Sequence, residues 1–283
     1  MSVDLALTRD QLLDHARALP AAPRIMAELC ELLQDINTDL DQIALVIRAD
    51  PALAARMIRI SNSVVYGGDW QVASIDEAVN RVGFEEVLRL VGTASVAGFV
   101  DRSLALYGLE VEDLRSSLLM HALAAESLAR WNAVDANAAY TAGLLRAMGM
   151  MVLDRAARGR LPEGLAYSPL QFATYGEWEN RRFGLGSPDV TRMVLDEWRF
   201  PPDIVTAIEE QMLPRPASYD NPFACLLNLA GAIVLDAGVA LPGERELWTV
   251  TPQKLAGAGL DEGQFVAAAE DARAHYTRMS AGL

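Results

Sequence analysis

The chain has 283 residues, of which 52% are apolar and 22% charged, so it can bury a core for one large domain or two smaller ones, and a disordered chain is excluded. Its formal net charge is −14 and its pI about 4.6, which argues against nucleic-acid binding, because that function needs basic residues to replace the counterions on phosphate. Ala and Leu dominate, whereas β-branched and aromatic residues are sparse, which favours helices.

The predicted elements of the first hundred residues are all helices, because apolar side chains recur there every three to four residues. Each helix is preceded by a residue that can cap its first turn, or begins with a proline that suits that position. A turn at residues 66–69 separates the fourth helix from the fifth, and Gly83 ends the fifth. The N-terminal signals, in chain order, are Thr8 with Gln11, Pro23, Thr38 or Asp39, Asp50 with Pro51, and Ser74 with Glu77.

The remainder of the chain is also predicted to be helical, with residues 161–175 as an irregular segment. Ser187 and Pro188 open one helix, and Pro201 with Pro202 breaks it. No stretch alternates with period two for long enough to predict a strand, so we expect an all-α fold. The other predicted helices cover about 84–103, 111–131, 135–157, 202–212, 221–237 and 261–280.

Compartment signals favour a cytoplasmic protein. The first residues lack a basic segment followed by an apolar run, so no signal peptide is expected, and the longest apolar stretches, such as residues 90–100, are too short to span a bilayer. Cys30 and Cys225 lie far apart in apolar surroundings, which predicts buried thiols in a reducing compartment rather than a disulfide or a metal pair.

The stretch from Asp50 to Gly67, DPALAARMIRISNSVVYG, resembles the signature of HDOD domains, in which a DPxL helix start runs into an NSxxYG turn. LPAAP at 19–23 is similar to the family's LPxxP entry, GLL with MG at 143–149 to the frame GLLHDIG, and residues 177–201 to the frame E…FG…H…W.LP. The resemblance covers about residues 12–212. We expect the signature residues to shape a helix start and a turn rather than to catalyse a reaction; they are Asp50, Pro51, Leu53, Asn62, Ser63, Tyr66 and Gly67.

The resemblance implies a two-lobed helical bundle whose second lobe is related to the HD phosphohydrolases. We expect an N-terminal lobe over residues 1–105, a degenerate HD-like core over 106–212, and a helical extension over 213–283 that packs on this core. As the resemblance also implies, such domains are output or scaffold modules of bacterial signalling that act through protein contacts.

The HD phosphohydrolases, as the resemblance implies, hold metal ions with His and Asp side chains on facing helices, because these ligands fix the ion and leave a position for water. Of the three histidines, only His121 falls within the corresponding region; His15 and His275 are expected at the surface. We therefore expect no catalytic residue, no metal and no cofactor, and a structural role for His121 in the core. The vestigial positions are His121, Arg146 and Ala147 at the His-Asp pair, Ser187 after FG, Glu210 and Gln211 at a later pair, and Gly231 at a late aspartate.

Two roles are open for Arg146. Its guanidinium could replace the charge of the ion and pair with Glu210 or a nearby aspartate, which would seal the site, or it could reach solvent. A second basic group, Arg155, Arg158 and Arg160, lies at a predicted helix end and either complements the helix dipole or contacts an anion.

We therefore expect a non-catalytic signalling protein with protein partners, without nucleic-acid or membrane binding, and with a homodimer as a further candidate assembly. One alternative is a sensor that binds a nucleotide or another anion in the degenerate pocket. A second is a residual phosphohydrolase with a rearranged metal site.

Overall fold

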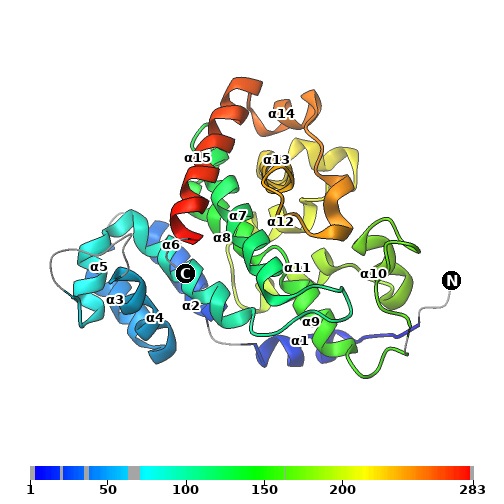
Figure 1. Cartoon of the computed structure of the whole chain (residues 1–283), viewed down its shortest axis with the longest axis horizontal. Helices are drawn as coiled ribbons and strands as arrows, with labels where there is room; N and C mark the ends of the chain where they lie inside the picture. The colour runs from blue at the N-terminus through cyan, green and yellow to red at the C-terminus, as the bar shows by residue number, and fades with distance from the viewer. Residues whose placement is uncertain (1–3, 20–21, 35–37, 63–70, 163, 281–283) are drawn as a thin grey trace.

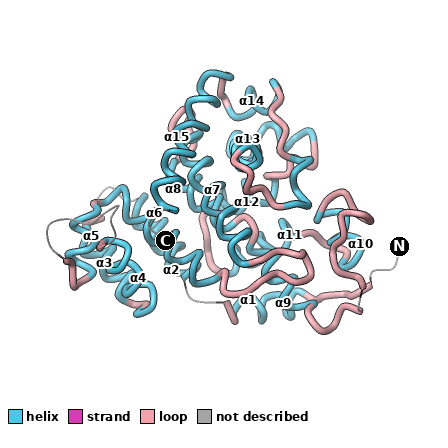
Figure 2. Tube along the Cα trace, in the orientation of Figure 1, coloured by secondary structure: helices cyan, strands magenta, loops and turns pink. Residues whose placement is uncertain are grey.

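The computed structural model describes residues 4–19, 22–34, 38–62, 71–162 and 164–280 (Figure 1). Over these ranges it contains fifteen α-helices, two 3-10 helices and no strand, which confirms the all-α prediction (Figure 2). A bridge between Leu104 and Leu109 is isolated from any sheet. No helix among the described residues is long and apolar enough to cross a membrane. Three signature positions, Ser63, Tyr66 and Gly67, lie outside the described residues.

The helices before α7 (Val111–Ala129) are called the first lobe here and those from α7 onward the second lobe. The helices of the first lobe are short, and their starts follow the capping signals of the sequence. Asp39, rather than Thr38, caps its helix, and its side chain accepts a hydrogen bond from the Gln42 amide. Asp50 accepts from the amide of Leu53 at the next helix start. Gly83 ends a helix with a φ of +81°, a conformation that favours glycine. The helices are α1 (Arg9–Arg17), α2 (Ala22–Gln34), α3 (Leu40–Arg48), α4 (Pro51–Ser61), α5 (Ile75–Val82) and α6 (Phe84–Phe99).

Among these helices, α1 packs on later parts of the chain. It lies against α9 and α11 of the second lobe, whereas α2 packs on α3 and α6. In Figure 1, α3, α4 and α5 stand together to the left, joined to the rest of the molecule through α2 and α6.

The second lobe surrounds α7 (Val111–Ala129), which packs on α8, α13 and α15. The predicted helix over 135–157 is two helices, because the chain turns at Arg146 and Ala147. Gly143 allows α8 to approach α7, since a Cβ there would lie 2.5 Å from the Cα of Ala122. The other elements are α8 (Ala136–Leu145), α9 (Met148–Ala157), α10 (Tyr175–Phe183), α11 (Ser187–Glu197), α12 (Pro202–Glu210), η1 (Pro216–Asp220), α13 (Pro222–Asp236), η2 (Pro242–Leu247), α14 (Pro252–Ala258) and α15 (Glu262–Ser280).

Candidate functional site

Arg146 lies at the bend between α8 and α9, and its side chain is buried, with 1% exposed. Its Nε donates to Oε1 of Gln211 at 2.7 Å, and its Nη2 donates to Oε1 of Glu244 at 2.7 Å. The side chain of Glu244, which comes from η2, is 5% exposed. Arg146 therefore forms a buried ion pair and does not reach solvent.

The carboxylate that pairs with Arg146 differs from the predicted one. Glu210 accepts hydrogen bonds from Arg215 at 2.8 Å and from the side chain of Asn221 at 3.1 Å, so it binds residues of the segment that follows α12. Gln211, the next residue, is the one that faces Arg146. The cause is the direction of the side chains at the end of α12, where neighbouring residues point to different sides of the helix.

Trp248 covers the vestigial site from the segment that follows η2. The guanidinium of Arg146 lies 5.2 Å from the centroid of its ring, and the imidazole of His121 lies 5.8 Å from it. A Cβ at Gly231 would lie 2.3 Å from the Trp248 ring. An aspartate at that position, as the parent pattern has it, would collide with the indole. Trp248 therefore fills the space that any side chain at Gly231 would need.

His121 is a buried member of α7 with a hydrogen bond between its Nε2 and the carbonyl of Leu227 at 2.9 Å. Burial, together with the nearby charge of Arg146, lowers the pKa of His121 well below its ordinary value. The ring is therefore neutral, and because a carbonyl can only accept, Nε2 carries the proton. This hydrogen bond fastens α7 to α13.

Ser187 contacts a different buried carboxylate. Its amide donates to Oε2 of Glu179 at 2.7 Å, and the hydroxyl of Tyr107 donates to Oε1 of the same side chain at 2.7 Å. Burial raises the pKa of Glu179 to about 7. The carbonyl of Ser187 lies so near α9 that a Cβ at Gly149 would be 2.0 Å from it. Ser187 thus serves the packing of α9 on α11.

The residues at the vestigial positions do not fit a divalent ion. Arg146, Ala147 and Gly231 offer no ligand atom, and the guanidinium would repel a cation in this buried setting. Gln211 is committed to Arg146 and, through its Nε2, to the carbonyl of Ile208. Among the described residues, no group of three or more His, Cys, Asp or Glu side chains is placed to hold a metal.

The basic cluster at the end of α9 is engaged within the chain. Arg155 pairs with Asp101 at 2.7 Å, and Arg158 pairs with Asp154 at 2.6 Å and donates to the carbonyl of Ser103. Arg160 makes a long contact of 3.5 Å with the carbonyl of Ala156. Arg155 lies near the end of α9, whereas Arg146 lies at the bend before α9 begins, and the two arginines have different ion-pair partners. The cluster and the sealed pocket are therefore separate features.

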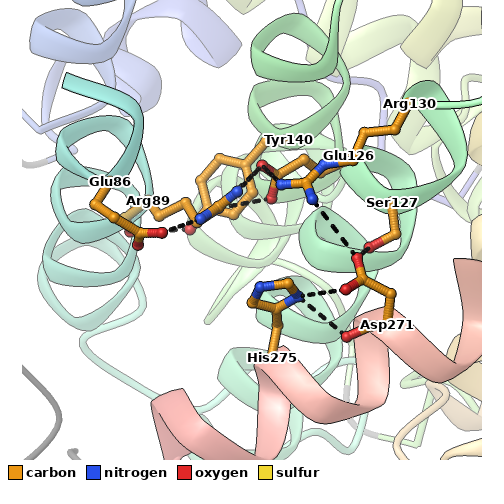
Figure 3. Close-up of polar contacts among 8 residues, drawn as sticks. All are labelled: Glu86, Arg89, Glu126, Ser127, Arg130, Tyr140, Asp271 and His275. Atoms are coloured by element: carbon orange, nitrogen blue, oxygen red, sulfur yellow. Dashed lines mark hydrogen bonds and ion pairs between the residues drawn. The ribbon is translucent and has the colours of Figure 1, made fainter. Parts of the chain in front are cut away.

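A second buried arginine, Arg89 of α6, joins the two lobes (Figure 3). Its Nε donates to both carboxylate oxygens of Glu126 at 2.9 Å, and it also pairs with Glu86. The hydroxyl of Tyr140 donates to the backbone carbonyl of Arg89 at 3.0 Å. Helices α7 and α8 of the second lobe therefore both contact Arg89 of α6.

The same network continues outward to the C-terminal helix. Arg130 reaches Glu126 at 3.3 Å and Asp271 of α15 at 3.9 Å, and Ser127 donates to Asp271 at 2.8 Å. His275, expected at the surface, is half-buried, with its Nδ1 3.3 Å from Oδ1 of Asp271. The side chains of Arg89 and Glu126 are 7% and 8% exposed, whereas those of Arg130 and Asp271 are 45% and 40% exposed. Sequence reasoning missed this network, because its members lie far apart along the chain.

Comparison with known families and structures yields one family match. The HDOD domain family model matches residues 19–214. No curated protein matches the chain. This match includes the vestigial positions up to Gln211 but ends before Gly231, Glu244 and Trp248.

Several solved structures share the fold. A protein named as a candidate phosphohydrolase from Shewanella amazonensis SB2B is 23% identical, with a TM-score of 0.68 over 96% of this chain and 97% of that one. A candidate signal transduction protein from Marinobacter aquaeolei VT8 is 22% identical, with a TM-score of 0.67 over 96% of this chain and 65% of that one. An HDOD domain protein of unknown function from Geobacter sulfurreducens is 21% identical, with a TM-score of 0.65 over 96% of this chain and 97% of that one.

Proposed function

The chain belongs to the HDOD family, and on that premise we propose that it is a non-catalytic signalling protein that acts as an output or scaffold module through contacts with other proteins. The observation that supports this proposal is the buried ion pair of Arg146 and Glu244, since the family resemblance aligns Arg146 with a metal-binding residue of the HD phosphohydrolases. A guanidinium supplies positive charge there without offering a ligand to an ion or a position for an attacking water.

The energetics of the pair support a permanent seal. Removing one partner of a buried ion pair costs about 3–5 kcal/mol, because the other charge stays buried without compensation. If Arg146 separated from Glu244, the protein would incur this cost. Opening the site would also remove the contact in which the indole of Trp248 packs on Gly231. Protein contacts then remain as the means by which such a domain transmits a signal.

The proposal is tested by hydrolysis of bis(p-nitrophenyl) phosphate with Mn²⁺, Mg²⁺ or Ni²⁺. We expect no hydrolysis above the metal-only background for the wild-type chain or for Arg146→Ala. Metal-dependent turnover that Arg146→Ala changes would replace the scaffold proposal with a residual phosphohydrolase. If Arg146→Ala left both the melting temperature and all partner binding unchanged, the seal itself would be abandoned.

One observation favours the sensor alternative. Nη1 of Arg146 is buried with no hydrogen-bond partner, and so is Oδ1 of Asn228, whose Nδ2 donates to the carbonyl of Gln211. A small anion could accept from Nη1 only. We expect inorganic phosphate and a panel of nucleotides at millimolar concentration to leave the melting temperature unchanged. An upward shift that disappears in Arg146→Ala would favour the sensor over the scaffold.

A further inference from the structure

A pocket of about 590 Å³ opens at the seam between the two lobes. One wall is α2 of the first lobe, and the other is formed by the end of α1 and the residues that end α11. Its volume lies in the range of about 300–1,000 Å³ that ligand pockets occupy. None of its lining residues contributes to the sealed site around Arg146, so the pocket is a separate feature. The lining side chains that matter are Arg17, Glu28, Glu31, Glu197, Trp198 and Arg199.

The charged side chains of this pocket are of two kinds: Arg17 and Glu197 form an ion pair with each other, and the others form none among the described residues. Arg17 pairs with Glu197 at 2.8 Å and with Asp14 at 3.0 Å, so its charge is compensated. Glu28 and Glu31 lie three residues apart on α2, which places them on the same side of that helix. Within the described part of the chain, no ion pair forms at Glu28, Glu31 or Arg199. The pocket therefore presents two carboxylates on one wall and a guanidinium on the other.

Arg199 occupies a position that favours glycine. The amide of Phe200 donates to the carbonyl of Leu195 and that of Arg199 to the carbonyl of Asp196, which is the pattern of a helix end whose next residue is left-handed. The φ of Arg199 is +60°, a conformation that strains any residue with a Cβ. The fold thus carries strain at the residue that brings a guanidinium to the pocket.

We propose that this pocket docks a peptide segment of a partner protein, which presents a basic side chain to Glu28 and Glu31 and a carboxylate to Arg199. The proposal deepens the scaffold function and rests on it. Charge complementarity favours this occupant, because two carboxylates would repel the phosphates of a nucleotide and attract an ammonium or guanidinium group. A segment bound there contacts both lobes and is sensitive to their relative placement.

The test measures binding of the 283-residue chain to an array of twelve-residue Gly/Ala peptides. Each peptide carries one Arg or Lys and one Asp or Glu, and the set covers every spacing between them. Control peptides carry only one of the two charges. The pocket variants are Glu28→Gln/Glu31→Gln and Arg199→Gly. The matched control is Glu262→Gln/Glu270→Gln, which removes the same charge from exposed positions of α15.

We expect the wild-type protein to bind peptides with both charges at least about fivefold more strongly than peptides with one, which corresponds to about 1 kcal/mol. The Glu28/Glu31 variant should lose the preference for the basic residue. Arg199→Gly should lose the preference for the acidic residue while its melting temperature rises, because glycine relieves the strain. The control should behave as wild type.

The proposal is overturned if the wild-type protein shows no preference for two charges, or if the control weakens binding as much as the pocket variants do, since attraction would then follow net charge alone. It is also overturned if free lysine or arginine at millimolar concentration binds in the pocket while no peptide does. The scaffold function is judged separately, by the absence of metal-dependent hydrolysis in the same protein samples, so the two proposals can fail independently.

Discussion

Arg146 and Arg89 are both buried, and each pairs with a buried carboxylate, yet their surroundings differ. All partners of Arg146 belong to the second lobe, and Trp248 covers it. Arg89 belongs to the first lobe, and its partner Glu126 belongs to the second and is linked through Arg130 to solvent-exposed groups. A buried ion pair can thus stay within one part of the fold, as at Arg146, or connect two parts of it, as at Arg89.

Removing the carboxylate partner should therefore have a different effect at Arg89 than at Arg146. Loss of Glu126 from Arg89 should affect both lobes, and also α15, because the network extends to that helix. At Arg146, the effect should stay within the second lobe.

Removing Glu126 should have the largest effect. Glu126→Ala leaves Arg89 with Glu86 and takes one partner from Arg130, so we expect the free energy of unfolding to fall by about 4 kcal/mol in denaturant titrations. Hydrogen exchange should accelerate in α6. Glu112→Ala, at an exposed pair with Arg115, is the control and should cost less than about 0.5 kcal/mol. An Arg89→Leu/Glu126→Leu variant that is as unstable as Glu126→Ala would contradict an electrostatic cause.

Removing Glu244 should cost somewhat less and act elsewhere. Glu244→Ala leaves Arg146 with Gln211 alone, and we expect a loss of about 3 kcal/mol. Hydrogen exchange should accelerate in residues 242–249 and in α13 but not in α6. Glu246→Ala, two residues away, is the matched control. Equal acceleration in α6 for Glu244→Ala and Glu126→Ala would erase the contrast between the two arginines.

The sealed region should also carry a pH dependence through Glu179. Burial raises its pKa from 4.5 to about 7, so between these values the folded chain binds a proton that the unfolded chain has lost. Stability should therefore fall as pH rises from about 4.5 to 7, by about 3 kcal/mol in all, and stay level above that window. Glu179→Gln should remove this part of the slope. Identical slopes for the two proteins between pH 5 and 8 would show that Glu179 ionises normally.

The smallest expected effect concerns the segment that carries Trp248. Lys254, the only lysine in the sequence, donates from Nζ to the carbonyls of Leu247 and Thr249, at 3.1 and 2.7 Å. Lys254→Met removes these donors, and we expect a loss of about 1–2 kcal/mol with faster hydrogen exchange at 247–249. Lys254→Arg should lose less. A Lys254→Met protein with wild-type exchange would mean that Trp248 is held without this lysine.

Local signals made most of the fold predictable from the sequence. Helix starts at Asp39, Asp50 and Ser74 depend on side chains within three residues, so they can be recognised in a single stretch. The break at Arg146 and Ala147 was not predicted, because both residues favour helices and the turn is imposed by packing. The helix α10 was also missed, since only the family frame pointed to that region.

The site could be predicted only in part. The family pattern pointed to Arg146, Gln211 and Gly231, but it gave no indication that Glu244 and Trp248 would be their neighbours. Glu244 is 98 residues from Arg146 along the chain, and nothing in its local sequence marks it as a partner. Pairing at such separation is decided by tertiary packing, as it also is for Arg89 and Glu126.

The most direct test of the central claim is the metal content of untagged protein, prepared without chelators and measured by inductively coupled plasma mass spectrometry. Because the buried guanidinium of Arg146 lies where we propose that a metal ion was once held, we predict less than about a tenth of an equivalent of any transition metal, before and after incubation with Mn²⁺, Zn²⁺ or Ni²⁺ followed by dialysis. A near-stoichiometric metal that is lost on mutation of His121 or Glu244 would contradict the sealed, non-catalytic site.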